Sequence, residues 1–455
     1  MANVDLGRYR KIVQMFWDPE PSNDPLLDRP VWCLGQSYKL HRGPQERAGD
    51  GESTNSTVGE YESTAASTVP EKSKIINLPP NNAPDTPPAS TGGSFSYSGR
   101  TETDYENGWP QKFVADFESR FWMTYRSEFK TIPRSADPKA ASSMSLPMRI
   151  KYQLGDPVGF SSDSGWGCMI RSGQSLLANA IGIVRLGRDW RRGQRRAEEI
   201  KILRMFADDP AAPYAIHNFV SHGSTRCGKY PGEWFGPSAT SQCIKALIDT
   251  NETDMRVYTT GDSPDVYEDR FMATAKSVDG VFKPTVILIS TRLGIDKITQ
   301  VYWEALISAL QMPQSLGIAG TPANHEERSG RPSSSHYFVG SQGKFLFYLD
   351  PHHTRMALPY KENIKDYTAE EVDSCHTSRL RRLHVQEMDP SMLIGFMIRS
   401  EKEWEEWRRG IKHVQGKAII YVADSDPRLQ NKPEGREGAI DEVEILSDDD
   451  TGDEV

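Results

Sequence analysis

The spacing of apolar residues predicts helices in two stretches of the chain. After Cys168, apolar or small side chains return at helical intervals, which predicts a helix with this cysteine in its first turn. These residues are Ile170, Gly173, Leu177, Ile181 and Val184. Upstream, an aromatic ring occupies every fourth position, at Phe113, Phe117, Phe121, Tyr125 and Phe129. This stripe predicts one helix that buries its aromatic face and holds the Tyr125 hydroxyl at its inner edge.

Short apolar runs predict strands between the helices. Residues 285–290 and 344–349 are apolar enough to form buried strands. Residues 336–340 precede the second run and are joined to it by a Ser-Gln-Gly turn, which predicts a hairpin. Residues 30–35 predict a short strand or packed turn, and residues 400–403 have the sequence of a capping box that opens a helix. Strands interleaved with helices indicate a mixed α/β (α+β) domain.

Composition sets two segments apart from this domain. Residues 41–105 are rich in Ser, Thr, Pro, Gly and Asn, and residues 41–104 contain a single leucine, Leu78, and no tryptophan or cysteine. Such a stretch buries too little apolar area to offset its chain entropy, so we expect a disordered insertion. We expect residues 1–40 to pack on a main domain over residues 106–424, which is followed by a disordered acidic tail over residues 425–455.

The charge distribution and the cysteine content narrow the classes of protein to which the chain can belong. Residues 441–455 contain eight acidic residues and no basic one, so the rest of the chain carries 54 basic and 55 acidic side chains. This nearly neutral body argues against a nucleic-acid partner, and the arginine-rich stretch 188–196, interleaved with acids, indicates a solvated helix face. Five cysteines without a C-x-x-C pair predict neither structural zinc nor a disulfide framework. Without a signal-peptide core or a run of roughly 18 apolar residues, we expect a cytoplasmic protein.

The turn before Cys168 has the composition of a nucleophile site. A cysteine attacks carbonyl carbons as thiolate, which the N–H groups and the positive dipole of a helix N-terminus stabilise. Gly165 and Gly167 permit backbone conformations closed to other residues and allow a substrate backbone to approach closely. The side chains available to cap the helix are Ser162, Asp163 and Ser164. We expect Trp166 to shield the site.

A second motif, Asp350-Pro351-His352, follows the predicted hairpin. Residues two apart on an extended chain point to one side, so Asp350 can orient the His352 imidazole, which takes the thiol proton. Each motif alone has a commoner explanation, because an isolated cysteine is usually a small buried side chain and Asp-Pro-His is usually a strand that ends in a turn. Together the two motifs indicate a thiol protease.

Residues 162–174 resemble the nucleophile motif of the autophagins, cysteine proteases that process the ubiquitin-like modifier of autophagy, and residues 348–352 resemble the family's second motif. Further matches follow the family order and cover most of the main domain, at residues 121–126, 233–237, 312–320 and 331–338. The resemblance implies a papain-like fold with an added helical subdomain. It also implies that Tyr125 helps to form the oxyanion hole, that Trp234 covers the catalytic cysteine, and that Pro332 gates the cleft from a loop interrupted here by residues 321–330.

By this resemblance, the protein cleaves after the C-terminal glycine of the autophagy modifier, both to mature its precursor and to release it from phosphatidylethanolamine. Catalysis would rest on Cys168, His352, Asp350 and Tyr125 without a cofactor or metal. The membrane would be contacted only through the lipidated substrate, with recruitment to forming autophagosomes. Two alternatives stay open: a protease of a Ufm-type modifier, whose family shares the order Asp before His, and a non-catalytic modifier-binding scaffold.

Two short patterns are candidate contacts for the modifier. Tyr9 and Ile12 fit the aromatic-x-x-aliphatic pattern that autophagy modifiers bind, although so short a pattern also arises by chance. Residues 443–446, Val-Glu-Ile-Leu, are flanked by acids and have the alternation of a strand that could pair with a ubiquitin-like sheet edge. Val443 stands where the family's motif begins with an aromatic residue, which makes this segment resemble SUMO-binding strands. A solvated acidic tail is the alternative.

Overall fold

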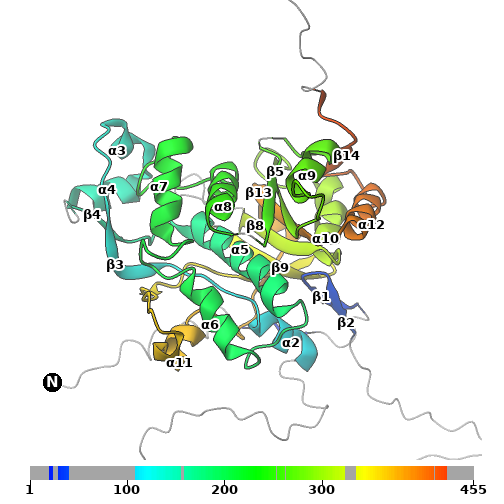
Figure 1. The fold of residues 1–455 in the computed structure, drawn as a ribbon, viewed down its shortest axis with the longest axis horizontal. Coiled ribbons are helices and arrows are strands. Elements are labelled where there is room, and N and C mark those ends of the chain that lie inside the picture. Colours follow the sequence, from blue (N-terminus) through cyan, green and yellow to red (C-terminus); the bar gives the residue numbers. More distant parts are fainter. Residues whose placement is uncertain are drawn as a thin grey trace, which may run out of the picture. The chain divides into compact units, whose positions relative to one another are not determined.

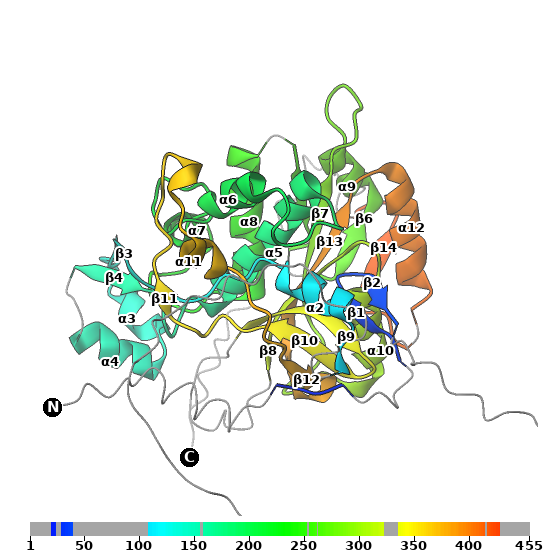
Figure 2. The same cartoon turned by 90° about the horizontal axis from the view of Figure 1, so that it is seen from below.

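The computed structural model describes residues 20–23, 29–39, 108–154, 158–252, 254–261, 263–322, 335–414 and 416–427 (Figures 1 and 2). The predictions for Tyr9, Ile12, Pro332, and residues 41–105 and 443–446 lie outside these ranges. Within them, no helix is both long enough and apolar enough to cross a bilayer.

A nine-stranded sheet forms the centre of the described structure (Figure 1). Seven strands follow the order β12-β10-β9-β8-β13-β7-β5, and β1 joins β2 to β9. Their bounds are β1 Val31–Cys33, β2 Gln36–Tyr38, β5 Arg256–Thr259, β7 Thr285–Arg292, β8 Ser315–Pro322, β9 His336–Gln342, β10 Phe345–Leu349, β12 Arg382–His384 and β13 Met388–Ile398. All neighbours pair antiparallel except β5 and β7, which are parallel.

Alternate residues of the central strands enter two separate hydrophobic cores, because successive side chains of a strand point to opposite faces. Val286 and Leu288 of β7 pack with α5 and α8, whereas Ile287 and Ile289 pack with α9, α10 and α12. The bounds of these helices are α5 Cys168–Leu186, α8 Pro237–Asn251, α9 Glu268–Ala275, α10 Trp303–Gln311 and α12 Glu401–Lys412. The predicted α/β layering is therefore confirmed.

The remaining elements surround α5 and the edges of the sheet (Figure 2). A three-stranded sheet has the order β11-β3-β4, and β6 pairs with β14. The bounds are α2 Gln111–Glu118, β3 Arg126–Pro133, α3 Lys139–Ser143, α4 Leu146–Leu154, β4 Gly159–Ser162, α6 Arg196–Arg204, α7 Ile216–Arg226, β6 Asp265–Tyr267, β11 Arg355–Met356, α11 Ala369–Asp373 and β14 Tyr421–Ala423. Strand β4 ends where the turn before Cys168 begins, and β11 begins just after His352, so the small sheet flanks both motifs.

Several local predictions are confirmed. Strands β9 and β10 form the predicted hairpin, β7 includes residues 285–290, and β1 lies within residues 30–35 and pairs with β9. The Ser400 side chain accepts a hydrogen bond from the Glu403 N–H at 3.2 Å and so caps α12 as predicted. The Glu403 carboxylate, however, accepts from the Arg399 N–H and guanidinium, so it does not close the capping box.

The prediction of one helix through the aromatic stripe is wrong. All five rings are buried, but α2 ends at Glu118, and the last ring lies in β3. The backbone between these elements bonds to tertiary partners: Asn179 pairs through its side-chain amide with both the N–H and the carbonyl of Phe121, and the Tyr125 N–H donates to the Pro351 carbonyl. These bonds satisfy groups that a longer helix would have paired internally.

The prediction of a solvated helix face at residues 188–196 is wrong about the helix, because most of this stretch forms turns between α5 and α6. It is right about solvent for Arg195 and Arg196, which are exposed, but not for Arg188. Arg188 donates to both oxygens of the fully buried Asp116 carboxylate and to the Cys33 carbonyl. Arg120 and Arg191 pair with the same carboxylate. A buried carboxylate requires such partners, so Arg188 joins β1 to α2.

Candidate active site

Cys168 lies where the nucleophile turn meets α5. It is the first residue of the helix and is 3% exposed, so its sulfur lies at the positive end of the helix dipole. Gly165 has a φ of 95°, a conformation that other residues rarely adopt. Gly167 has a φ of −86° instead, and it is needed for space, because a Cβ there would overlap the Asp163 carboxylate.

Asp163 holds this turn through hydrogen bonds that were not predicted from the sequence. No side chain caps α5, so the prediction that Ser162, Asp163 or Ser164 caps the helix is wrong. The buried Asp163 carboxylate accepts from the Arg126 N–H at 2.7 Å and from Arg171 Nε at 2.8 Å. These two strong bonds engage both carboxylate oxygens. The Asp163 backbone carbonyl accepts from the Gly167 N–H and closes the turn.

His352 and Asp350 face each other as the motif predicts. Asp350 Oδ1 accepts from His352 Nδ1 at 2.6 Å and from the His352 backbone N–H at 3.0 Å. Asp350 Oδ2 accepts from Arg381 Nη1 at 2.8 Å. The carboxylate is thereby fixed at both oxygens, and the imidazole is oriented with Nε2 as the nitrogen left for chemistry.

Tyr125 lies beside both groups, although it does not lie on a helix. Its ring stands perpendicular to that of His352, with 5.2 Å between ring centres. Burial raises the pKa of the Tyr125 hydroxyl, and the neighbouring Cys168 sulfur raises it further through charge and a hydrogen bond. The phenol is therefore a neutral hydrogen-bond donor next to the sulfur at physiological pH.

The electrostatics favour a thiolate–imidazolium pair. Burial alone raises the pKa of the Cys168 thiol, but the hydrogen bond and charge of His352 outweigh it, and the Ser335 backbone N–H and the Tyr125 hydroxyl lower it further. Burial lowers the pKa of His352, yet Asp350 and Cys168 together raise it from 6.5 to about 9. His352 Nε2 is buried and has no partner of standard hydrogen-bond geometry among the described residues. It is nevertheless close enough to the Cys168 sulfur for each group to shift the pKa of the other.

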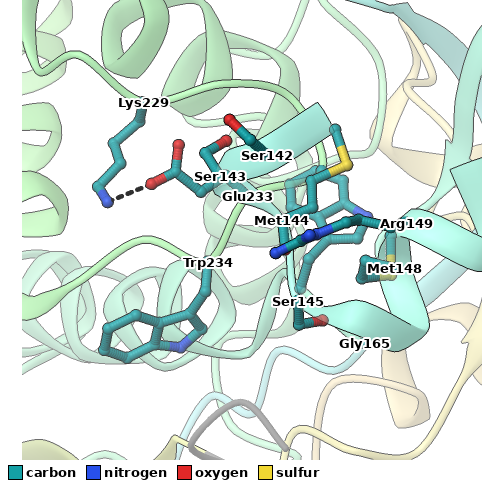
Figure 3. A pocket seen from close by; sticks show the side chains of 12 residues that line it. Ser142, Ser143, Met144, Ser145, Met148, Arg149, Gly165, Lys229, Glu233 and Trp234 are labelled. Carbon is teal, nitrogen blue, oxygen red and sulfur yellow. Dashed lines mark hydrogen bonds and ion pairs between the residues drawn. The ribbon is translucent and has the colours of Figure 1, made fainter. Parts of the chain in front are cut away.

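The two tryptophans line a cavity of about 360 Å³ beside the nucleophile turn (Figure 3). Trp166 is buried and donates its indole N–H to the Ser162 carbonyl, so it supports the turn from within. Trp234 is half-buried and packs at the edge of the core. Figure 3 shows it across the cavity from Met148 and Arg149 of α4. Pro332, the third predicted substrate contact, lies outside the described residues.

Three further groups touch the site and were not predicted from the sequence. His336 Nε2 lies 3.5 Å from Asp350 Oδ1, its ring lies 5.1 Å from that of His352, and the preceding Ser335 provides a backbone N–H to the Cys168 sulfur. Arg381 supports the carboxylate from the other side. The hairpin offered a signal for His336, because the register that pairs Leu349 with Tyr337 brings the next residues, Asp350 and His336, together.

Three residues of the site have the donor atoms of a possible metal site. His336, Asp350 and His352 form a cluster whose nitrogen and oxygen atoms lie within 4.8 Å of one another. The hydrogen bond between Asp350 and His352 accounts for the closest of these approaches. The prediction that neither metal nor cofactor is needed stays a prediction.

A cysteine at a helix N-terminus that faces an imidazole held by a carboxylate, beside a sheet covered by helices on both faces, defines a thiol protease. Residues 110–410 match the Peptidase C54 catalytic domain. "Cysteine protease ATG4" of Gibberella zeae is 60% identical over 99% of this chain and 98% of its own length. "Probable cysteine protease atg4" of Botryotinia fuckeliana is 56% identical over 99% and 98%, and "Cysteine protease 1" of Neurospora crassa is 52% identical over 99% and 92%. The chain therefore belongs to the autophagin family of papain-like cysteine proteases.

Proposed function

We propose that this cysteine protease cleaves after the C-terminal glycine of the ubiquitin-like autophagy modifier, maturing its precursor and releasing it from phosphatidylethanolamine. The observation that supports this most directly is the group formed by Cys168, His352, Asp350 and Tyr125, in a chain 60% identical to a "Cysteine protease ATG4". Both reactions break an amide bond at a glycine carbonyl, so one acyl-transfer site serves both.

The first half-reaction transfers the glycine acyl group to Cys168. The thiolate forms a bond to the carbonyl carbon, and the negative charge that develops on the oxygen is met by the Tyr125 hydroxyl and the Cys168 backbone N–H. His352 Nε2 donates its proton to the leaving nitrogen as the C–N bond breaks. The leaving amine is the next residue of a precursor or the ethanolamine of the lipid. The product on the enzyme is a thioester.

The second half-reaction hydrolyses the thioester. His352, now neutral, accepts a proton from water through Nε2, and the resulting hydroxide attacks the same carbonyl carbon. The C–S bond breaks, the thiolate returns, and the modifier leaves with a free glycine carboxylate. Asp350 keeps the imidazole in one tautomer through both steps, and Arg381 in turn holds Asp350.

A glycine-ended tail suits the geometry we propose. Trp234 would cover the sulfur, so only a chain without side chains at its end could reach Cys168. Trp234 Nε1 is buried and has no hydrogen-bond partner within the described ranges, which makes it a donor available to a substrate carbonyl. The gating role of Pro332 and the modifier contacts of residues 9–12 and 443–446 belong to this proposal. So do a cytoplasmic location, recruitment to forming autophagosomes, and membrane contact only through the lipidated substrate.

Mass spectrometry of a modifier precursor extended past its glycine tests the proposal. We expect one new product that ends in glycine, no product with Cys168→Ala, and normal cleavage with the matched control Cys227→Ala, because Cys227 lies at the end of α7. Cleavage of a Ufm-type precursor alone would instead favour the protease of another modifier. Tight binding of the precursor without any cleavage by the wild type would favour the scaffold.

A further inference from the structure

Helix α4 exposes an apolar face to solvent. Leu146, Ile150 and Leu154 are four residues apart, so they lie on one face of the helix, and they are 64%, 50% and 83% exposed. Among the described helices, α4 alone exposes three large apolar side chains. Side chains of this kind gain free energy when a partner removes them from water, so three of them together mark a contact surface. The chemistry described above does not use this face.

The opposite face of α4 packs on the turn before Cys168. Met148 is buried, and its Sδ lies so close to Gly165 that a Cβ on that glycine would be 3.3 Å from it. Tyr152, one helical turn further on, packs against the core beside Phe160, with 6.0 Å between the ring centres. Because the helix is held from this side, its apolar face is presented in a fixed position, and a partner does not have to order it.

The same helix forms one wall of the cavity beside that turn (Figure 3). Met148 and Arg149 line the cavity across from Trp234. A volume of about 360 Å³ is that of a small-ligand site, so the cavity can take the tail of a polypeptide substrate but not a folded body. The body must then rest on the surface around the opening, and α4 is part of that surface.

The charge of this segment limits the kind of partner that fits. Residues 138–154 contain three basic residues and no acidic one, so they favour a surface with acidic side chains around an apolar patch. A lipid bilayer is a poorer match, because helices that lie in a bilayer interface have a broad apolar face that often includes aromatic rings. Helix α4 has nine residues, and the exposed Gln153 lies beside its three outward apolar side chains.

We propose that the outward face of α4, formed by Leu146, Ile150 and Leu154, binds the folded body of the ubiquitin-like substrate while the substrate's C-terminal tail enters the cavity at Trp234. The inference rests on the proposed function, since it takes the modifier as the substrate. The face lies outside the reacting groups, so it holds the substrate equally well before and during bond breaking. It therefore lowers KM and leaves kcat unchanged.

Steady-state cleavage of the folded precursor tests this contact. The double variant Ile150→Gln with Leu154→Gln removes two apolar side chains and keeps residues that favour a helix. We expect KM to rise roughly 10-fold or more and kcat to stay at the wild-type value. The matched control is Val278→Gln, which removes a fully exposed apolar side chain after α9 and should change neither constant. Circular dichroism and the melting temperature establish that each variant is folded.

Titration of the precursor into the inactive Cys168→Ala form separates this inference from the proposed function, because it measures binding without cleavage. In that background the double variant should raise Kd in parallel with KM. An unchanged Kd, or no measurable binding by Cys168→Ala itself, overturns the docking face. If the double variant weakens binding as expected but the wild type does not cleave the precursor, only the proposed reaction fails.

Two other occupants of the face are distinguished by further measurements on the wild type and the double variant. The first measurement is cosedimentation with vesicles of phosphatidylcholine and phosphatidylserine in equal amounts, and the second is sedimentation velocity of the protein alone. If the double variant loses vesicle binding or a dimer that the wild type shows, while its Kd for the precursor is unchanged, the face serves a lipid surface or a second copy of the chain. Either result overturns the proposal.

Discussion

Replacing Asp350 by asparagine keeps the shape of the carboxyl group and removes its charge, and this change isolates what the carboxylate does for His352. The carboxylate accepts from both Nδ1 and the backbone N–H of that histidine. Asparagine can still place its carbonyl oxygen near Nδ1. It can also turn its NH₂ group toward Nδ1, which leaves the proton on Nε2 and prevents that nitrogen from accepting the thiol proton.

The magnitude follows from the two pKa values of the imidazole. Burial alone places the pKa of His352 below 6.5, and Asp350 with Cys168 raises it to about 9. The net rise of the His352 pKa, from 6.5 to about 9, corresponds to roughly 3 kcal/mol. Asp350 and Cys168 share this stabilisation of the imidazolium, and they also offset the opposing effect of burial. Without the carboxylate charge, we expect the pKa of His352 to fall by one to two pH units, at about 1.4 kcal/mol per unit. The wrong tautomer adds to the loss, so kcat should drop by roughly 10²- to 10⁴-fold.

The pH dependence of kcat/KM for precursor cleavage measures this shift. Activity needs the thiolate and the imidazolium together, so it should rise with pH as Cys168 deprotonates and fall as His352 loses its proton near pH 9. In Asp350→Asn the alkaline limb should move to lower pH. The exposed Asp373, changed to asparagine, is the matched control and should keep both limbs in place. An alkaline limb that stays near pH 9 in Asp350→Asn would refute the reasoning, because the carboxylate would then contribute nothing to the imidazolium.

Four further predictions follow from the same contacts and from composition. Tyr125→Phe should lower kcat by roughly 10- to 1,000-fold with little change in melting temperature, and a wild-type rate would reduce this residue to packing. Gly167→Ala should cost about 1–3 kcal/mol in urea unfolding, because its Cβ meets the Asp163 carboxylate, and an unchanged midpoint contradicts that contact. Deleting residues 44–99 should leave the melting temperature and cleavage nearly intact, whereas a large drop would show that this stretch folds. Truncation after Ile440 should weaken affinity for the modifier several-fold at low salt and less at high salt, and equal dissociation constants by titration would leave the tail without a role in capture.

Short sequence patterns correctly predicted the elements whose deciding residues are neighbours in the chain. The β9–β10 hairpin follows from two apolar runs and a glycine turn, and the two-residue spacing of Asp350 and His352 is enough to bring them together at its end. The start of α5 at Cys168 was predictable for the same reason, since glycines before an apolar helical repeat mark a helix boundary. In each case the deciding residues are neighbours in the sequence.

The aromatic stripe shows where local patterns fail. Its spacing fits a helix, and its rings are buried as a helix face would be, yet the chain leaves the helix after Glu118. Asn179, about 60 residues away, provides the bonds that hold Phe121 outside the helix, at 3.1 and 3.0 Å. A short stretch of sequence around Phe121 does not include Asn179. The four-residue spacing of the aromatic rings therefore predicted correctly that they are buried, but wrongly that their backbone is helical.

Long-range hydrogen bonds also explain the role of Asp163, which the sequence offered only as a helix cap. Its Oδ1 accepts from the Arg126 N–H, next to Tyr125, while its Oδ2 accepts from Arg171 in the first turn of α5. Arg171 continues to Asp208, whose other oxygen accepts from the Leu358 N–H beyond β11. One chain of buried charged bonds therefore fixes the turn before Cys168, the strand after Tyr125 and the segment after His352 relative to one another. Because burial makes each unpaired charge costly, the network sets the geometry of the site more firmly than a solvent-exposed cap could.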